Sequence, residues 1–358
     1  MIRLRIKVIK IQILRKSKKG SLNLESRTKT KLTNRMVEKL VKTHFGEKVS
    51  IDEIVEATEG WFNAVYLVTF HIDGDRYEIA LKIGIQNGKY TLRYEQDIMK
   101  TELDIYDLIE STIIPAPKIL FRDFSYQMID APYFIMEKLN GGSWESLSQE
   151  VGEENQASLM EEMGRYLGAL HNIKGDWFGY PKEDISYHYP DWRSAFQGMM
   201  NRVIEDGKKE GVDLPYDEVL SVMEPYWEIF EEIKVPCLVN FDMWTKNIML
   251  REEKNRFVID GIIDYERSFY GDCYADFLAV AENGGCPVEE NEDFIKGYNQ
   301  TAETPFSYTY YDQLRSYFYE IYLALVMGTE IYRYNEEDTR EMLTYCRHEL
   351  KKYIELVS

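Results

Sequence analysis

The side chains best suited to chemistry lie in two short segments of the second half of the chain. Asp242 and Asn247 are five residues apart in the stretch VNFDMWTKNIML (239–250), and Asp264 follows seventeen residues after Asn247 in the stretch IIDYE (262–266). Phosphoryl transfer needs a carboxylate that orients the acceptor hydroxyl and hard oxygen ligands that hold magnesium on the phosphates. We therefore predict Asp242 as the catalytic carboxylate and Asn247 with Asp264 as magnesium ligands.

The spacing of these residues must be weighed against chance, because an isolated D-x-x-x-x-N is common in loops and turns. A β-hairpin between Asn247 and Asp264 would return both side chains to one face of a site. The sequence continues with Gly271-Asp272 and with Asp276, so a whole series of motifs is present. This series favours a phosphotransferase site over a hairpin with ordinary turn residues.

A lysine in the first half supports the same chemistry. Lys82 interrupts an apolar run in Ala80-Leu81-Lys82-Ile83. A kinase needs such a strand lysine for the α- and β-phosphates, braced by a glutamate on a helix. Alone, Lys82 would more often be a surface lysine on an edge strand. No G-x-x-x-x-G-K-[ST] is present, which excludes the other common ATP-binding loop.

The elements that must position these residues fall into two groups. Alternating apolar residues predict strands at 51–55, 63–71, 76–85, 118–124 and 132–137, with a hairpin turn at 73–75 and helices at 36–45 and 90–113. We therefore expect an N-terminal lobe at 36–138, made of an antiparallel sheet with one key helix. Asn140-Gly141-Gly142 then predicts a hinge.

The rest of the chain, 139–358, is predicted to be mainly helical. Helical spacing predicts helices at 157–173, 192–203, 216–233, 312–334 and 338–357, and one β-rich stretch at 237–265 carries the catalytic motifs. The fold class is therefore α+β with two lobes. Residues 1–35 carry twelve Lys and Arg against one Glu and show no chemical motif. We expect a dispensable tail first. The alternatives are an extra strand with a linker, a surface-binding arm, and sequence upstream of a true start at Met36. Order is expected to begin near Thr33 and Asn34, where a helix cap fits.

At these motifs the chain resembles the aminoglycoside phosphotransferase and choline kinase-like superfamily, over residues 49–345. That family has H-x-D-x-x-x-x-N, then an apolar pair before Asp, then G-D-x-x-x-D before an apolar residue. The matching residues here are Asp242, Asn247, Asp264, Gly271, Asp272, Asp276 and Phe277. Gly60 to Tyr66 is similar to the family's G-x-x-N-x-x-Y nucleotide loop. One residue departs from the pattern, since Asn240 stands where the family usually has His.

The resemblance implies a protein-kinase-like fold, ATP and Mg²⁺ as the required cofactors, and further site residues. It makes Glu102 the partner of Lys82, with Glu95 as the alternative, and places Gly60 and Asn63 over the phosphates. Met136 would line the adenine pocket, while the backbone of Glu137 and Leu139 would bond the adenine edge. Two acidic residues, Glu266 and Glu320, are assigned to the substrate. His171 ends an apolar helix and is interpreted as a core histidine.

The amino-acid composition limits the classes of molecule that the protein is expected to bind. The net charge is −19 although the first 35 residues are basic, so the body of the protein would repel nucleic acid and anionic membrane and attract a cationic small molecule. Ordinary solubility charge is the simpler explanation on net charge alone. No uncharged apolar run is long enough to span a bilayer, and the four cysteines lack zinc-site spacing. We expect a soluble, cytoplasmic protein.

Three functions remain in competition. The first is ATP-dependent phosphorylation of a small, cationic, hydroxylated molecule, with aminoglycosides ahead of amino alcohols and sugars. The second is a catalytically weak nucleotide-binding protein with a regulatory role, supported by Asn240 and the glycine-poor nucleotide loop. The third, a protein kinase, lacks the A-P-E segment after Asp264. The motifs fix neither ATP over GTP nor the oligomeric state.

Overall fold

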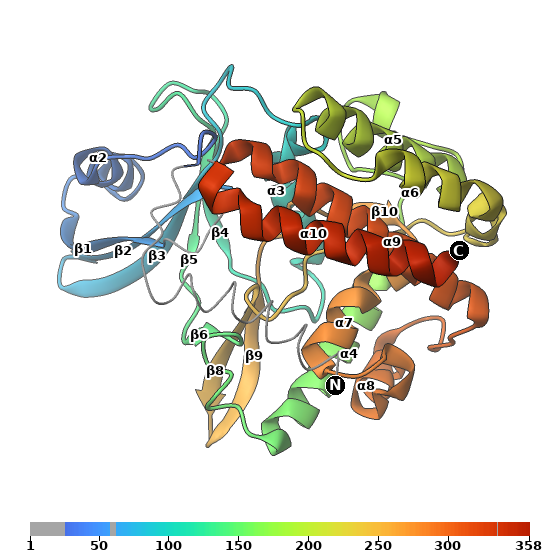
Figure 1. Cartoon of the computed structure of the whole chain (residues 1–358). Helices are drawn as coiled ribbons and strands as arrows, with labels where there is room; N and C mark the ends of the chain where they lie inside the picture. Colours follow the sequence, from blue (N-terminus) through green and yellow to red (C-terminus); the bar gives the residue numbers. More distant parts are fainter. Residues whose placement is uncertain (1–25, 58–61, 335) are drawn as a thin grey trace.

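The N-terminal lobe is an antiparallel sheet in the computed structural model, which describes residues 26–57, 62–334 and 336–358. Its five strands have the order β1-β2-β3-β5-β4 (Figure 1). Their bounds are β1 Ser50–Ala57, β2 Ala64–Ile72, β3 Asp75–Ile83, β4 Ile119–Asp123 and β5 Tyr133–Glu137. Asp73 and Gly74 both have positive φ, at 52° and 100°, which is the geometry of a tight hairpin turn. The predicted turn and strands are confirmed.

Helix α2 (Asn34–Phe45) packs on this sheet through Val37, Leu40 and Val41. Thr33 caps the helix by accepting a hydrogen bond from the backbone N–H of Met36. Upstream of the cap, the backbone N–H of Leu32 donates to the hydroxyl of Tyr66 at 2.7 Å.

The segment before α2 also reaches the other lobe. The N–H of Arg27 donates to the carbonyl of Arg333 at 2.9 Å, and Thr28 is buried. The predicted helix cap at Thr33 is confirmed, while backbone hydrogen bonds hold residues 26–32 as well, so order begins earlier in the chain than predicted. Residues 1–25 lie outside the described part of the chain.

We expect a chain that starts at residue 36 to be less stable than one that starts at residue 26. The shorter chain loses the Thr33 cap and the contacts of Thr28 and Leu32. Loss of the cap alone costs about 1 kcal/mol. Chemical denaturation of the two chains checks this, and the chain starting at 26 is the matched control for removal of the upstream residues. Equal free energies of unfolding would show that segment 26–35 adds no stability.

Helix α3 (Ile98–Ile109) is shorter than the predicted helix at 90–113. A separate turn of 3-10 helix, η1 (Arg93–Glu95), precedes it, and Asp97 between them has a left-handed φ of 57°. A continuous helix cannot pass through that conformation, so the chain changes direction before Ile98. This change of direction frees residues 92–96, which we call the inter-lobe segment, to pack away from α3.

The inter-lobe segment is buried in the second lobe. Leu92 and Tyr94 belong to the same hydrophobic cluster as Trp192 and Phe196 of helix α5 (Trp192–Lys209). The Arg93 guanidinium donates from Nε to Asp206 at 2.7 Å. The two lobes are thus joined here as well as at the predicted hinge.

The hinge leads into a short strand, β6 (Gly142–Ser143), that pairs with β8 (Ile248–Glu253). Gly141 has a φ of 92°, and a Cβ at this position would collide with the carbonyl oxygen of Leu250. Glycine is therefore required here on two grounds. The β8 strand continues through a turn into β9 (Arg256–Ile262), so the predicted catalytic hairpin is confirmed.

The C-terminal lobe is mainly helical, as predicted. Its other elements are α4 Glu153–His171, α6 Tyr216–Met223, α7 Phe277–Gly284, α8 Glu292–Thr301, α9 Tyr310–Thr329, α10 Glu336–Val357 and the strands β7 Cys237–Val239 and β10 Phe269–Gly271. The predicted helix at 216–233 changes to 3-10 helix (η3, Glu224–Glu232) where Pro225 removes a backbone donor. Among the described residues, no helix combines the length and the apolar character needed to cross a bilayer.

Candidate active site

The loop between β7 and β8 carries Asp242. The buried carboxylate of Asp276 holds the backbone of this loop. Asp276 accepts hydrogen bonds from the backbone N–H of Phe241 at 2.6 Å and of Asn240 at 2.9 Å. Phe241 has a positive φ of 61°, a strained conformation for a bulky residue. The two bonds to Asp276 stabilise that conformation.

His171, buried at the end of α4, lies behind this brace. Its Nε2 is 3.1 Å from Asp276 Oδ2, and its Nδ1 is 3.0 Å from the hydroxyl of Tyr298. Both ring nitrogens therefore have partners inside the core. This agrees with the interpretation of His171 as a core histidine, because its contacts support the loop from outside the site.

Asp242 is oriented by its neighbours in the loop. Its backbone N–H donates to Asn240 Oδ1 at 2.7 Å, and its Oδ2 accepts from Asn247 Nδ2 at 2.8 Å. Its other oxygen, Oδ1, accepts no hydrogen bond from a described residue. Burial raises the pKa of Asp242, while Lys246 and Arg267 oppose that rise. One carboxylate oxygen is thus fixed and the other is available to a ligand.

Asp264 is brought beside Asn247 by the hairpin. Ile248 pairs with Ile262, and the N–H of Ile263 donates to the carbonyl of Asn247 at 2.9 Å. Burial would raise the pKa of Asp264, but the charge and hydrogen bond of Lys82 outweigh it and lower the pKa. The side-chain NH₂ of Asn247 donates to Asp242, so the side-chain oxygen of Asn247 remains available to a metal ion. An amide oxygen and an ionised carboxylate are the hard donors that magnesium prefers, and they fit the predicted metal site.

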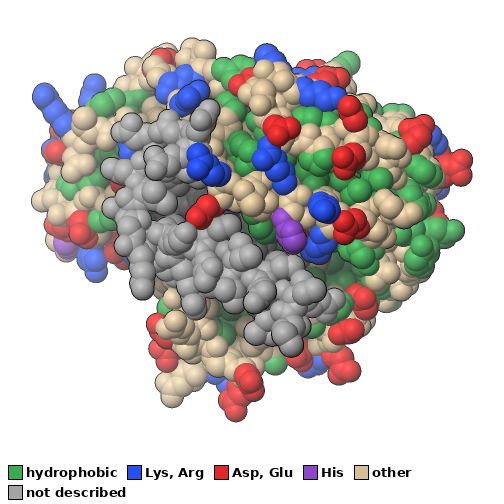
Figure 2. Space-filling model, viewed as in Figure 1, with side chains coloured by type: hydrophobic (Ala, Val, Ile, Leu, Met, Phe, Trp, Pro, Cys, Tyr) green, Lys and Arg blue, Asp and Glu red, His purple; other side chains and the backbone are tan. Residues whose placement is uncertain are grey.

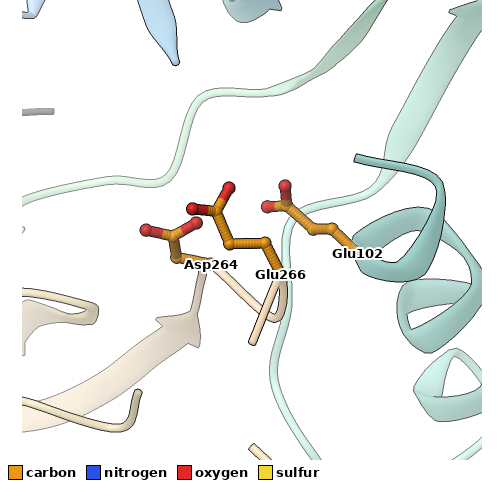
Figure 3. Close-up of side chains that lie close together, drawn as sticks. All are labelled: Glu102, Asp264 and Glu266. Atoms are coloured by element: carbon orange, nitrogen blue, oxygen red, sulfur yellow. The ribbon is translucent and has the colours of Figure 1, made fainter. Parts of the chain in front are cut away.

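Lys82, on β3, lies among three carboxylates. Its Nζ is 2.6 Å from Glu102 Oε2, 2.8 Å from Asp264 Oδ1 and 3.4 Å from Glu266 Oε2. The three acidic side chains point toward one another, Glu102 from α3 and the other two from the segment after β9 (Figure 3). Burial alone would lower the pKa of Lys82, but these carboxylates raise it well above its usual value.

The predicted pair of Lys82 with Glu102 is therefore present in the structure, and the alternative partner is placed elsewhere. Glu95 bonds the N–H of Leu92 at 2.9 Å and forms an ion pair with Arg333. Burial raises the pKa of Glu102 to about 7 in spite of the neighbouring ammonium.

The nucleotide loop reaches the same cluster through Asn63. Its Nδ2 donates to Glu266 Oε2 at 2.7 Å, and Asn63 is almost fully buried. Gly60, the other residue predicted for this loop, lies outside the described residues. Burial and the charge of Asp264 raise the pKa of Glu266 to about 8.

Two acidic residues were assigned to the substrate. Glu266 lies beside Lys82 and Asn63. Glu320 lies on the face of α9 that packs on α10, where burial and the charge of Glu320 raise the pKa of Tyr353. Both side chains thus make contacts within the protein, and their assignment to the substrate stays a prediction. The sequence could not separate the faces of α9 because apolar residues surround most of that helix.

The residues predicted for adenine lie where the lobes meet. Met136 is buried in β5, the side chain of Glu137 is exposed, and the Glu137 N–H donates to the carbonyl of Lys118 at 2.9 Å. Leu139 packs on Gly261 of β9. The Leu139 N–H donates to no acceptor within the described part of the chain, which leaves it available to an adenine edge.

Two charged residues lie near Asp242. Arg267 was not selected from the sequence, and Glu330 was not among the assigned site residues. Arg267 Nη1 is 3.9 Å from Asp242 Oδ1, and its Nη2 is 2.8 and 3.0 Å from the carboxylate oxygens of Glu330. Glu330 follows α9 directly and also accepts a hydrogen bond from Tyr94. Arg267 directly follows the IIDYE motif, and that position was the only sequence signal for it.

We expect Asn240→His to reduce stability without raising turnover. Asn240 is fully buried and its Oδ1 already makes the hydrogen bond that the loop needs. A larger imidazole would overpack this position and lower the free energy of unfolding by about 1–3 kcal/mol. Thermal unfolding and turnover of this one variant decide the point. Faster turnover at unchanged stability would mean that Asn240 weakens the enzyme.

Comparison with known proteins identifies a family and several solved structures that are similar to this chain. Residues 53–317 match the model of the phosphotransferase enzyme family. No curated protein sequence matches the chain. Among solved structures, the chain is similar to a candidate aminoglycoside phosphotransferase of Ralstonia eutropha JMP134, with a TM-score of 0.63, 16% identity, and coverage of 91% of this chain and 98% of that one.

Two further similar structures were solved with nucleotide and antibiotic. The streptomycin–ATP complex of APH(2")-IIa gives a TM-score of 0.55 at 18% identity, covering 91% of this chain and 99% of that one. The complex of APH(4)-Ia with AMP-PNP and hygromycin B gives 0.57 at 15% identity, covering 89% and 97%. At such identities the likeness establishes the fold, which is the predicted two-lobed, kinase-like one.

Proposed function

The chain belongs to the phosphotransferase enzyme family, and we propose that it transfers the terminal phosphoryl group of ATP to a hydroxyl of a small, cationic molecule. The observation that carries the proposal is the placement of Asn247, whose NH₂ fixes Asp242 while its backbone carbonyl accepts from the residue before Asp264. One residue thus links the carboxylate for the acceptor with the carboxylate for the metal.

The nucleotide would bind between Lys82 and the hinge. Lys82 would contact the α- and β-phosphates from the position in which Glu102 holds it at 2.6 Å. The free N–H of Leu139 would bond the adenine edge, beside Met136. Magnesium, held by Asn247 and Asp264, would neutralise charge on the phosphates. Asn63 would keep the nucleotide loop closed on Glu266.

Asp242 would orient the acceptor. Its Oδ1 would accept the hydrogen bond of the attacking hydroxyl and take its proton as the new P–O bond forms. The bond from Asn247 to Oδ2 leaves the carboxylate a single orientation. Positioning and electrostatics provide most of the catalysis in phosphoryl transfer, so a rigid carboxylate suits this role.

Aminoglycosides are the first acceptors to test, with amino alcohols and sugars next. The similar structures include complexes with streptomycin and hygromycin B. The net charge of −19 would attract a polycation. The regulatory alternative rests on Asn240, yet Asn240 supports the loop with its own hydrogen bond. The arrangement of Lys82, Asp242, Asn247 and Asp264 supports catalysis over the regulatory alternative.

The test is nucleotide turnover by the full chain against a panel of aminoglycosides, amino alcohols and sugars. ATP and GTP are compared, each with magnesium and with excess chelator. We expect acceptor-dependent release of nucleoside diphosphate that needs the metal and favours ATP, with phosphate on the acceptor by mass spectrometry. Tight magnesium-dependent ATP binding without turnover of any acceptor would favour the regulatory role.

A further inference from the structure

The oxygen of Asp242 that faces an acceptor has a cationic neighbour. Asp242 Oδ2 is occupied by Asn247, while Oδ1 lies 3.9 Å from Arg267 Nη1. A hydroxyl bound to Oδ1 would therefore lie beside the guanidinium. Lys246, four residues after Asp242 in the same loop and exposed, is a second positive charge that acts on this carboxylate.

The Arg267 guanidinium is held in place from its far side. Its Nη2 donates to both oxygens of Glu330 at 2.8 and 3.0 Å, and Glu330 is itself bonded by Tyr94 and lies 3.5 Å from Arg333. These partners satisfy one edge of the guanidinium. The other donors, Nη1 and Nε, make no hydrogen bond to a described residue, and 18% of the side chain is exposed.

The negative charge of Glu330 is already balanced by its partners within the protein. Two guanidinium groups and a tyrosine hydroxyl already surround its carboxylate, so it is not free to bind an ammonium of the acceptor. The charged group beside the reacting hydroxyl is therefore the Arg267 guanidinium, which still has hydrogen-bond donors without an acceptor among the described residues. Such a donor stabilises an oxygen on the acceptor and repels an ammonium.

We propose that Arg267 is a specificity-determining residue that selects acceptors whose reacting hydroxyl has an oxygen, rather than an amine, on the neighbouring carbon. This inference rests on the proposed function and narrows its acceptor class. A polycationic acceptor still fits, provided that its amines lie away from the reacting hydroxyl. Simple amino alcohols of the choline type do not fit, since their ammonium is on the carbon next to the hydroxyl-bearing one.

A purely structural role for Arg267 makes a different prediction. Arg267 could serve only as the counter-ion of Glu330 and Asp242, and its loss would then lower stability and all activities together. Selection between two acceptors that differ in one group would not change. The ratio of kcat/KM values for a matched pair is therefore the decisive measurement.

The experiment compares trans-1,2-cyclohexanediol with trans-2-aminocyclohexanol, which share one skeleton and differ in the neighbouring group. The proteins are the full chain, Arg267→Lys and Arg267→Gln. Arg122→Gln is the control, because Arg122 makes a comparable ion pair with Asp107 on the surface of the other lobe. Arg267→Lys keeps a positive charge beside Glu330, so at least this variant retains an ion pair with that carboxylate. Thermal unfolding and Mg·ATP binding are measured on each.

We expect the full chain and the control to prefer the diol, and Arg267→Gln to lose about ten- to a hundredfold in kcat/KM for the diol while keeping its activity on the amino alcohol. Arg267→Lys should lose less. On an aminoglycoside panel, the product should carry phosphate on a hydroxyl flanked by an oxygen-bearing carbon.

The outcomes separate the two claims. An unchanged diol-to-amine ratio in both variants, with the activity of the parent intact, overturns the role of Arg267 and leaves the phosphotransferase proposal standing. A parent enzyme that prefers the amino alcohol does the same. Failure of every acceptor to raise ADP formation removes the proposed function and this inference together.

Discussion

Asp242→Asn is expected to lower turnover by about a hundredfold or more while leaving Mg·ATP affinity nearly unchanged, since proton transfer by a positioned group contributes about 10²–10⁴. The asparagine can keep its carbonyl oxygen on the Asn247 NH₂, which places its own NH₂ where Oδ1 stood. The loop then retains its shape, and the acceptor hydroxyl meets a donor that cannot take a proton.

Steady-state turnover and calorimetric titration with Mg·ATP measure the two effects separately. Asp217→Asn is the matched control, because Asp217 is an exposed aspartate paired with Lys208 on the surface. Full turnover by Asp242→Asn would remove Asp242 from the assigned role. Loss of nucleotide binding would instead show that the substitution disturbs the metal site.

Asp264→Ala is expected to abolish magnesium-dependent ATP binding. The metal loses its ionised carboxylate, and Asn247 alone offers one neutral oxygen. The fold should survive, since Lys82 keeps its 2.6 Å ion pair with Glu102. A loss of affinity of at least about a hundredfold, or 2.7 kcal/mol, is expected from a calorimetric titration.

Asp217→Ala serves as the control for this second substitution, and circular dichroism checks that the variant is folded. The titration is repeated in chelator to separate the metal-dependent part of the affinity. If Asp264→Ala binds Mg·ATP as well as the parent, the metal assignment is wrong. If it binds equally weakly with and without magnesium, the assignment stands.

The proximity of the proposed catalytic residues could be predicted because they lie in one local unit. Asp242, Asn247 and Asp264 are joined by a single hairpin, and hairpin geometry follows from alternating apolar residues and a turn. The Lys82–Glu102 pair could not be predicted from local pattern alone, because it joins a strand to a helix. There the family resemblance indicated the partner.

The contacts that the sequence could not predict join distant segments. The bond from Asn63 to Glu266 joins positions 203 residues apart, and no local pattern indicates it. Glu320 lies in the middle of α9 and Glu330 directly follows it, and because that helix is apolar on most of its surface, tertiary packing alone decides which of them contacts Arg267. Segment 26–33 docks largely through backbone hydrogen bonds, which any residue type could make.

The inter-lobe segment has a mechanical consequence. The N-terminal lobe is attached to the C-terminal lobe through the hinge near Gly141 and again where Leu92 and Tyr94 enter the helical core. The bond from Arg27 to Arg333 adds a third connection, so the lobes are held together at more places than the hinge. Rotation of one lobe about the hinge would therefore have to pull Leu92 and Tyr94 out of the helical core.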